Sequence, residues 1–138
     1  MDRRKWYVLL LCIALCWMVA CYGCGKREKS TSELVADLKS PQEKDRIIAA
    51  RLLPLHKKDA DQAVPALIEA LKDPESDIRW SAAIGLGNLG EAAKEAIPAL
   101  QAAQKDRDAR VREAAGVALS RIDPTHFTAP SQQARRGK

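Results

Sequence analysis

The chain has 138 residues, a length that suits one small domain with terminal extensions and is too short for a two-domain enzyme. Its net charge of +5 raises the question of nucleic acid or an anionic membrane, and its four cysteines raise that of disulfides or zinc. The body of the protein supports neither idea. All four cysteines lie within residues 1–24, and residues 34–124 carry 14 basic and 15 acidic side chains. Composition therefore gives no support for a nucleic-acid-binding domain.

The N-terminal residues have the composition of an export signal. Three basic residues occupy positions 3–5, and no charged residue follows until Lys26. This segment has the order of a secretory signal peptide: basic residues come first, then an apolar run from Val8 to Val19, and then the small residue Ala20. We therefore predict a signal peptide over residues 1–20.

The end of this apolar run indicates lipid attachment. Met18-Val19-Ala20-Cys21 resembles the lipobox of bacterial lipoproteins, in which a small residue precedes a cysteine that receives a diacylglyceryl group before cleavage. By that resemblance Cys21 is the lipid-attachment residue and residues 21–31 form a lipidated tether, with Cys24 as a poorer second candidate. Two or more acyl chains hold a protein stably at a membrane, here one of the bacterial cell envelope. The alternative is an uncleaved transmembrane anchor, since residues 6–25 provide 20 uncharged positions.

The body of the chain is a repeat of 33 residues. When the sequence is shifted by 33, equivalent residues coincide over about 90 positions without an insertion. The coincident sets include Leu34, Leu67 and Leu100; Arg46, Arg79 and Arg112; Ala49, Ala82 and Ala115; and Leu53, Leu86 and Leu119. We place the repeat domain at residues 32–124, with units at about 34–65, 66–98 and 99–124.

Each unit is predicted to contain two helices. In the middle unit, the apolar residues from Val64 to Leu71 recur at helical spacing. Pro65 and its equivalent Pro98 are expected in the first turn of their helices, because a proline placed deeper would break the backbone hydrogen-bond ladder.

A repeated start signal precedes each second helix. Asp73-Pro74 occupies this position in the middle unit, Ser40-Pro41 in the first and Asp106-Arg107 in the third. Asp and Ser accept a backbone N–H at an N-cap, and Pro fits the first helical turn. The second helix of the middle unit is therefore predicted over about residues 75–89, and Gly90 supplies its stop.

The repeat resembles HEAT-like repeats, in the short form seen in phycobilisome-lyase-type proteins. The resemblance is carried by the run from Ala63 to Pro74, followed by Ile78-Arg79, Ala82-Ala83, Leu86-Gly87 and Leu89-Gly90. It implies an all-α fold, a short α-solenoid of about three antiparallel helix pairs that serves as a binding scaffold. The first unit is expected to be a polar cap, because Asp45 stands where the other units have Ile78 and Val111.

The sequence shows no pattern typical of catalysis. It contains no Gly-rich phosphate loop and no Gly-x-Ser-x-Gly motif, and its two histidines, His56 and His126, lie far from each other and from any cysteine. We therefore predict that the protein is not an enzyme, with no catalytic residue, no cofactor and no metal site. His56 is interpreted as a solvated residue at a helix end.

The arginine column at the repeat spacing has two interpretations. Arg46, Arg79 and Arg112 form either an anion-binding stripe or, as the resemblance to HEAT-like repeats suggests, a ladder between repeats with Asp73 and Asp106. We favour the ladder, because arginine forms strong bidentate pairs with carboxylates.

The candidate partner-binding residues lie on the second helices. Trp80, the only aromatic residue between positions 34 and 124, falls opposite the main apolar arc of its helix. With the equivalent positions of the other units, the candidate strip comprises Ile47, Arg51, Trp80, Ile84 and Val117. We expect it on the concave face, since an exposed Trp beside an Arg is typical of binding hot spots. The alternative is that Trp80 packs over a neighbouring unit or the tail.

The ends of the domain carry weaker signals. Ser30 and Glu33 have the spacing of a capping box for the first helix. Residues 125–138 are predicted to be a disordered basic tail, which either solubilises the chain or contacts anionic lipid.

These features together predict a non-catalytic, membrane-anchored scaffold that binds a protein partner of unknown identity through the concave face of the solenoid. The alternatives are a structural or assembly subunit that completes a longer solenoid through its end units, and an accessory factor of an envelope enzyme complex. Neither nucleic acid nor a small-molecule substrate is indicated.

Overall fold

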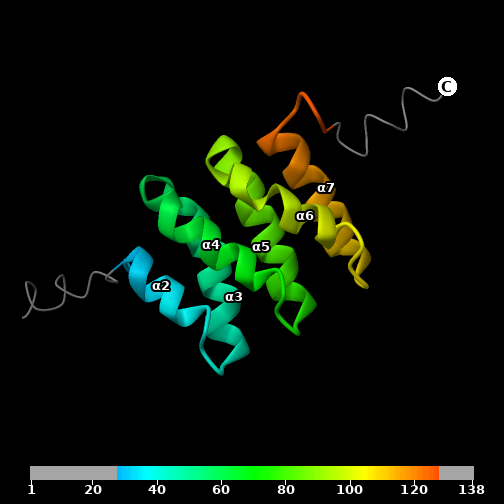
Figure 1. Ribbon diagram of the computed structural model, residues 1–138. Helices are drawn as coiled ribbons and strands as arrows, with labels where there is room; N and C mark the ends of the chain where they lie inside the picture. Colours follow the sequence, from blue (N-terminus) through cyan, green and yellow to red (C-terminus); the bar gives the residue numbers. More distant parts are fainter. Residues whose placement is uncertain (1–27, 128–138) are drawn as a thin grey trace, which may run out of the picture.

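The computed structural model describes residues 28–127, which form a stack of helices (Figure 1). The α-helices in chain order are α2 (Thr31–Asp37), α3 (Glu43–Leu52), α4 (Ala60–Ala70), α5 (Ser76–Leu89), α6 (Ile97–Ala103) and α7 (Ala109–Ile122). Short 3-10 helices are η1 (Leu53–Leu55), η2 (Lys57–Asp59) and η3 (Gly90–Ala96). None of the helices in this part of the chain is long and apolar enough to cross a membrane. The predicted signal peptide, Cys21 and most of the tail lie outside the described residues.

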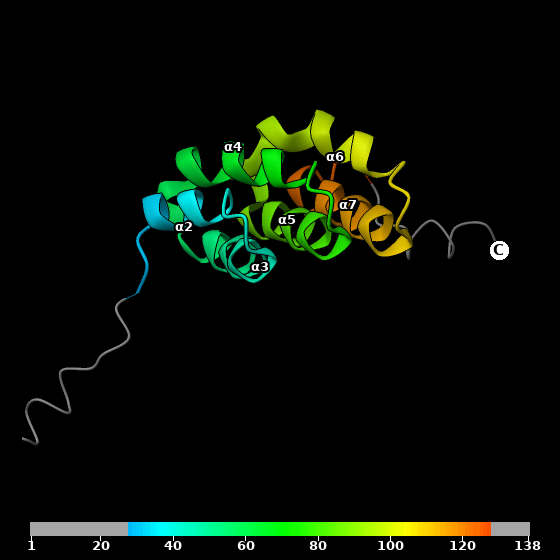
Figure 2. The same cartoon turned by 90° about the horizontal axis from the view of Figure 1, so that it is seen from below.

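Consecutive helices pair, and the pairs stack side by side in two layers. Figure 2 shows α2, α4 and α6 in one layer and α3, α5 and α7 in the other. The central helix α5 packs against both α3 and α7, so the second layer holds the three units together. The prediction of an all-α solenoid is therefore confirmed.

The repeated leucines and alanines form the core. Leu34, Leu67 and Leu100 from the first helices, and Leu53, Leu86 and Leu119 from the second, are all fully buried. Burying one such side chain contributes about 1.5–3 kcal/mol. The alanines that coincide in the repeat, Ala49, Ala82 and Ala115, are also fully buried and leave room for the helices to approach closely.

The predicted N-caps of the second helices are wrong by two residues. The N-cap of α5 is Glu75 rather than Asp73, and the helix begins at Ser76. The Asp73 carboxylate instead accepts the N–H of Glu75 at 2.9 Å. Asp106 likewise accepts the N–H of Asp108 at 2.8 Å, and Asp108 is the N-cap of α7. An Asp side chain can satisfy the backbone N–H two residues on in a turn as well as in a cap, so the signal does not specify the first helical residue.

The expected position of Pro65 is also wrong, whereas that of Pro98 is confirmed. Pro65 lies inside α4, which begins five residues earlier at Ala60 because η2 leads directly into it. Pro98 lies in the first turn of α6. The segment before α6 that corresponds to the start of α4 stays in 3-10 conformation and kinks at Ala93, so α6 begins only at Ile97.

The predicted helix ends agree with the structure. Gly90 follows Leu89 with a φ of 60°, a left-handed conformation that glycine adopts at no steric cost, and α5 ends there. At the first helix, the N–H of Glu33 donates to Ser30 Oγ and the N–H of Ser30 donates to Glu33 Oε2. The capping box is therefore confirmed and fixes the start of α2.

Candidate functional site

The arginine column forms the predicted ladder between repeats. Arg46 Nε donates to Asp73 Oδ2 at 2.8 Å, which joins α3 to the start of the second unit. Arg79 repeats this contact with Asp106, through Nε at 2.8 Å and a terminal nitrogen at 2.9 Å. Arg79 also donates to the backbone carbonyls of Asp73 and Pro74. These two arginines therefore lock neighbouring units together and are not available as an anion-binding stripe.

Burial makes the Arg79–Asp106 pair the stronger rung of the ladder. The two side chains are 6% and 12% exposed. The hydrogen bonds from Arg79 hold the pKa of Asp106 below its usual value, and Asp106 in turn raises the pKa of Arg79. The third member of the column, Arg112, is exposed and donates only to two backbone carbonyls within residues 28–127.

Polar contacts between residues 33 positions apart, the length of one repeat, join α5 and α7. Arg110 donates to Asp77 at 2.9 Å and Arg121 donates to Asn88 at 2.8 Å. Arg110 also lowers the pKa of Asp108 to about 2 through hydrogen bonds from its side chain and its backbone N–H. These contacts hold the side chains along the junction of the two helices in place.

Two grooves open along the second layer, on the surface of α3, α5 and α7 that we call the second-helix face. The first lies between α3 and α5, has a volume of about 390 Å³ and is lined by Ala50, Arg51, Pro54, Trp80, Ser81, Ile84, Gly85 and Asn88. The second lies between α5 and α7, has a volume of about 400 Å³ and is lined by Trp80, Ile84, Gly87, Arg110, Glu113, Ala114, Val117, Ala118 and Arg121. Trp80 and Ile84 line both grooves and form the ridge between them.

The structure brings four of the five predicted strip residues to these grooves. Trp80 and Ile84 are half-buried and pack against the core, Arg51 is exposed in the first groove, and Val117 is half-buried in the second. Ile47 is half-buried and lines neither groove. Trp80 thus rests on the core with one part of its surface and lines the two grooves with another.

Glycines on α5 set the distance between the helices beneath the ridge. A Cβ atom on Gly85 would lie 2.6 Å from Pro54 Cγ, and one on Gly87 would lie 2.9 Å from the Cα atom of Ala118. Both distances are shorter than real carbon contacts allow, so η1 and α7 approach α5 this closely only because Gly85 and Gly87 have no side chain. Because Gly85 and Gly87 have no side chain, Trp80 is the most prominent side chain of α5 on the second-helix face.

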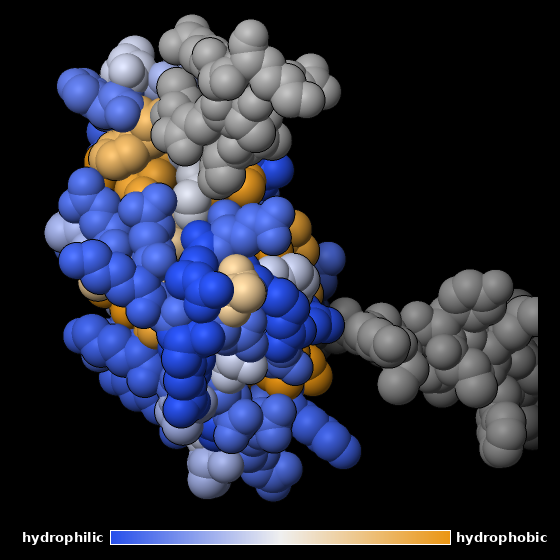
Figure 3. All heavy atoms as spheres, turned by 90° about the vertical axis from the view of Figure 1, so that its right-hand side faces the viewer, coloured by the Kyte–Doolittle hydropathy of each residue, from blue (hydrophilic) through white to orange (hydrophobic). Residues whose placement is uncertain are grey.

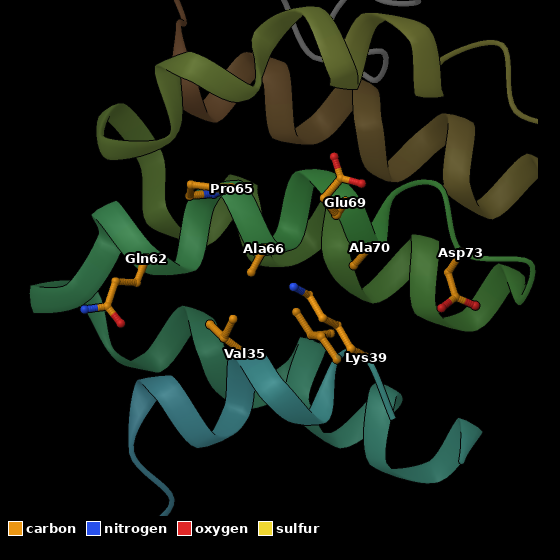
Figure 4. A pocket seen from close by; sticks show the side chains of 9 residues that line it. Val35, Lys39, Gln62, Pro65, Ala66, Glu69, Ala70 and Asp73 are labelled. Carbon is orange, nitrogen blue, oxygen red and sulfur yellow. The ribbon is translucent and has the colours of Figure 1, made fainter. Parts of the chain in front are cut away.

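Sequence reasoning missed a third groove, between α2 and α4 in the first layer. It has a volume of about 300 Å³ and is lined by Val35 of α2, by Lys39 in the turn after it, and by Pro65, Ala66 and Glu69 of α4. Figure 4 shows Ala66 pointing toward Val35, whereas the Glu69 carboxylate points away from α2. The sequence does contain a signal for an apolar surface between the first helices. Val35 coincides with Ile68 in the repeat, and both side chains are half-buried. The size of the groove depends on the length and angle of α2, which the repeat pattern does not specify.

The histidines are not brought together. His56 is half-buried between η1 and η2, and the exposed His126 contacts Asp123 through Nδ1 at 2.6 Å. Among residues 28–127, no three His, Cys, Asp or Glu side chains lie close enough to hold a metal ion.

Paired helices stacked in two layers, joined by an Arg–Asp ladder and grooved on one face, define an α-solenoid with a surface suited to binding. The chain matches the HEAT repeats family over residues 31–122, well over half of its length. It therefore belongs to the HEAT-repeat family. No curated protein matches the chain.

Proposed function

We propose that this HEAT-repeat protein is a non-catalytic, membrane-anchored scaffold that captures a protein partner on its second-helix face. HEAT repeats generally mediate protein–protein interaction, which supports the first part of the proposal. The observation that carries the site is the ridge of Trp80 and Ile84 between two grooves. A Trp in the centre of a contact surface is typical of residues that dominate binding energy.

The lining of the grooves indicates the chemistry of the partner. Arg51 and Arg121 are exposed at their rims, and Arg51 forms no ion pair within the described residues. The charge of Arg110 is offset by Asp77 and Asp108, and Glu113 is the one acidic residue in either lining. A segment with apolar anchors and acidic flanks complements this surface, in the manner of a helix bound in a groove.

The membrane part of the proposal is supported by the sequence before the domain. Met18 to Cys21 resembles a lipobox, and α2 begins at Thr31, ten residues after Cys21. Ten extended residues reach at most about 33–36 Å, so a lipid on Cys21 would hold the solenoid next to the membrane. Replacement of Cys21 by Ala is expected to release the chain from the membrane fraction and to abolish lipid labelling. Normal labelling and retention of this variant would refute lipid attachment at this residue.

Site-specific crosslinking tests the binding face. A photoreactive residue at position 113, an exposed position in the second groove, is expected to crosslink a discrete protein in native membranes. The same residue at position 102, exposed on α6 in the opposite layer, serves as the control and should give no such product. Excess unlabelled chain should compete for the crosslink, and a folded Trp80→Ala chain should compete much less. Equal crosslinking from both positions, or equal competition by both chains, would refute the proposed face.

A further inference from the structure

The outer edge of α3 carries the large exposed apolar side chains of the described domain. Ile48, Leu52 and Leu55 are 48%, 36% and 73% exposed. Ile48 and Leu52 are one helical turn apart, and Leu55 follows on η1, so the three form a continuous stripe. The expectation that the first unit is a polar cap is wrong on this edge: Asp45 lies one turn before Ile48, but it is half-buried and its carboxylate accepts a hydrogen bond from Ser40.

The repeat explains where this edge points. The residues equivalent to Ile48, Leu52 and Leu55 are Ser81, Gly85 and Asn88 on α5, and Ala114, Ala118 and Arg121 on α7. In both cases they line the groove toward the second helix of the preceding unit. The α3 edge is therefore the surface that a preceding unit would cover, and the first unit has no preceding unit within residues 28–127.

The α3 edge is not built to receive another repeat. Leu52 replaces the Gly85 and Ala118 that permit close helix approach in the other two junctions. In addition, Ser40 stands where the other units have Asp73 and Asp106, so an arginine from a preceding repeat would find no carboxylate. The opposite end of the solenoid does not offer a matching apolar surface either, because no large apolar side chain of α6 or α7 is among the exposed ones of the described residues. Most of the coloured surface visible on that side is hydrophilic, with scattered apolar patches (Figure 3).

Basic side chains surround the apolar stripe. Lys44 lies one turn before Ile48, Arg51 lies one turn before Leu55, and Lys57 and Lys58 follow in η2. All four are exposed, and none forms an ion pair within the described domain. The acidic residues nearby in the chain are Glu43, Asp45, Asp59 and Asp61. Asp45 and Asp59 accept hydrogen bonds from Ser40 and Thr31, and Glu43 and Asp61 are exposed.

We propose that the α3 edge, defined as Lys44, Ile48, Leu52 and Leu55, lies against an anionic lipid membrane. Exposed apolar side chains with basic neighbours are the pattern by which helices settle at the boundary of headgroups and acyl chains. Each basic residue near an anionic surface contributes about 1 kcal/mol. The inference rests on the proposed lipid tether, which holds the first unit close enough for this weak surface to act.

The contact determines how the solenoid stands on the membrane. Because α3 is the first helix of the second layer, docking of its outer edge places α5 and α7 progressively farther from the lipid (Figure 2). The two grooves beside Trp80 then open to the side, where a partner can reach them without displacing lipid.

Fluorescence quenching in vesicles tests this orientation. The full chain is reconstituted through its N-terminal segment into vesicles of phosphatidylglycerol and phosphatidylethanolamine, with a fluorescent noncanonical residue at position 55 or, as the control, at position 102. A nitroxide placed near the lipid headgroups is expected to quench position 55 several-fold more than position 102, and aqueous iodide should show the reverse order. Ile48→Glu or replacement of phosphatidylglycerol by phosphatidylcholine should reduce the difference, with the circular dichroism of the chain unchanged.

The possible outcomes separate the edge from the tether. Equal quenching at both positions, while the chain still sediments with the vesicles, overturns the docking proposal and leaves the tether standing. Sedimentation and lipid quenching at position 55 that both persist in Cys21→Ala overturn the tether and support the edge, whereas loss of both in the unsubstituted chain overturns both. Protection of position 55 from iodide before vesicles are added, together with a concentration-dependent increase in mass, overturns the proposal in favour of self-association through this edge.

Discussion

The rung formed by Arg79 and Asp106 provides the sharpest test of how the solenoid is held together. We predict that Asp106→Asn strongly destabilises the domain, although the new side chain has the same shape. The substitution removes the negative charge that accepts two hydrogen bonds from Arg79, at 2.8 and 2.9 Å. The guanidinium is then left at a site where only 6% of the side chain is exposed.

The size of the loss in unfolding free energy depends on the hydrogen bonds that remain after the substitution. Removal of one partner of a buried ion pair costs about 3–5 kcal/mol, because the other charge stays buried without compensation. Arg79 keeps its hydrogen bonds to the carbonyls of Asp73 and Pro74, and an Asn can still accept the N–H of Asp108. We therefore expect a loss at the lower end, about 3 kcal/mol. For a domain of this size that corresponds to a fall of about 12–24 °C in Tm.

Urea unfolding of the purified chain at pH 7, followed by circular dichroism, measures this loss. Arg112→Met is the matched control, because Arg112 occupies the same repeat position but is exposed and has no carboxylate partner in the described domain. It should change the free energy of unfolding by less than about 0.5 kcal/mol. The double variant with Arg79→Met should recover part of the Asp106→Asn loss. An Asp106→Asn loss below about 1 kcal/mol, or equal to that of Arg112→Met, would refute the ladder as a stabilising element.

Three further predictions address the acid sensitivity, the helix junction and the first helix. The folded-state pKa of Asp106 is lower than its unfolded pKa of about 3.9. Asp106 therefore stabilises the domain fully above the unfolded pKa and loses this contribution as the pH falls through the folded pKa. The free energy of unfolding, measured from about pH 5 to pH 2, should decline less steeply in Asp106→Asn. Gly87→Ala should cost about 1–2 kcal/mol in urea unfolding, since overpacking between α5 and α7 exceeds the gain in helix propensity, and an unchanged midpoint would show that the helices separate freely. Ser30→Ala should cost about 1 kcal/mol and accelerate hydrogen exchange in α2 alone; uniform acceleration across all helices would contradict a local capping role.

The repeat pattern predicted the core from periodicity, and the resemblance to HEAT-like repeats, with the chemistry of Arg–carboxylate pairs, predicted the ladder. Leu34, Leu67 and Leu100 recur at one position that faces the second helix of the same unit, and each is fully buried. Arg46 and Arg79 recur in the same way, 27 residues before their partners Asp73 and Asp106. The helix starts were predicted less accurately, since Asp and Pro at a junction are compatible with a cap, a turn or, for Pro65, the interior of a helix.

The binding surface depended on distances between helices that no local pattern contains. The sequence indicated that Trp80 and Ile84 share a side of α5, but the two grooves beside them exist because Gly85 and Gly87 allow η1 and α7 to approach. Ile47 belonged to the same predicted strip and lines neither groove. Periodicity specifies which face a residue occupies, whereas the shape of a groove depends on the packing of neighbouring helices.

By itself, the sequence determined that this protein is a helical repeat and which residues form its core. These properties follow from the amino-acid pattern of one unit repeated along the chain. Only the tertiary structure decided which repeated positions remain exposed, because exposure depends on whether a neighbouring unit is present. Ile48 and Ser81 occupy the same repeat position, yet Ser81 is buried beside α3 while Ile48, on the first unit, faces outward.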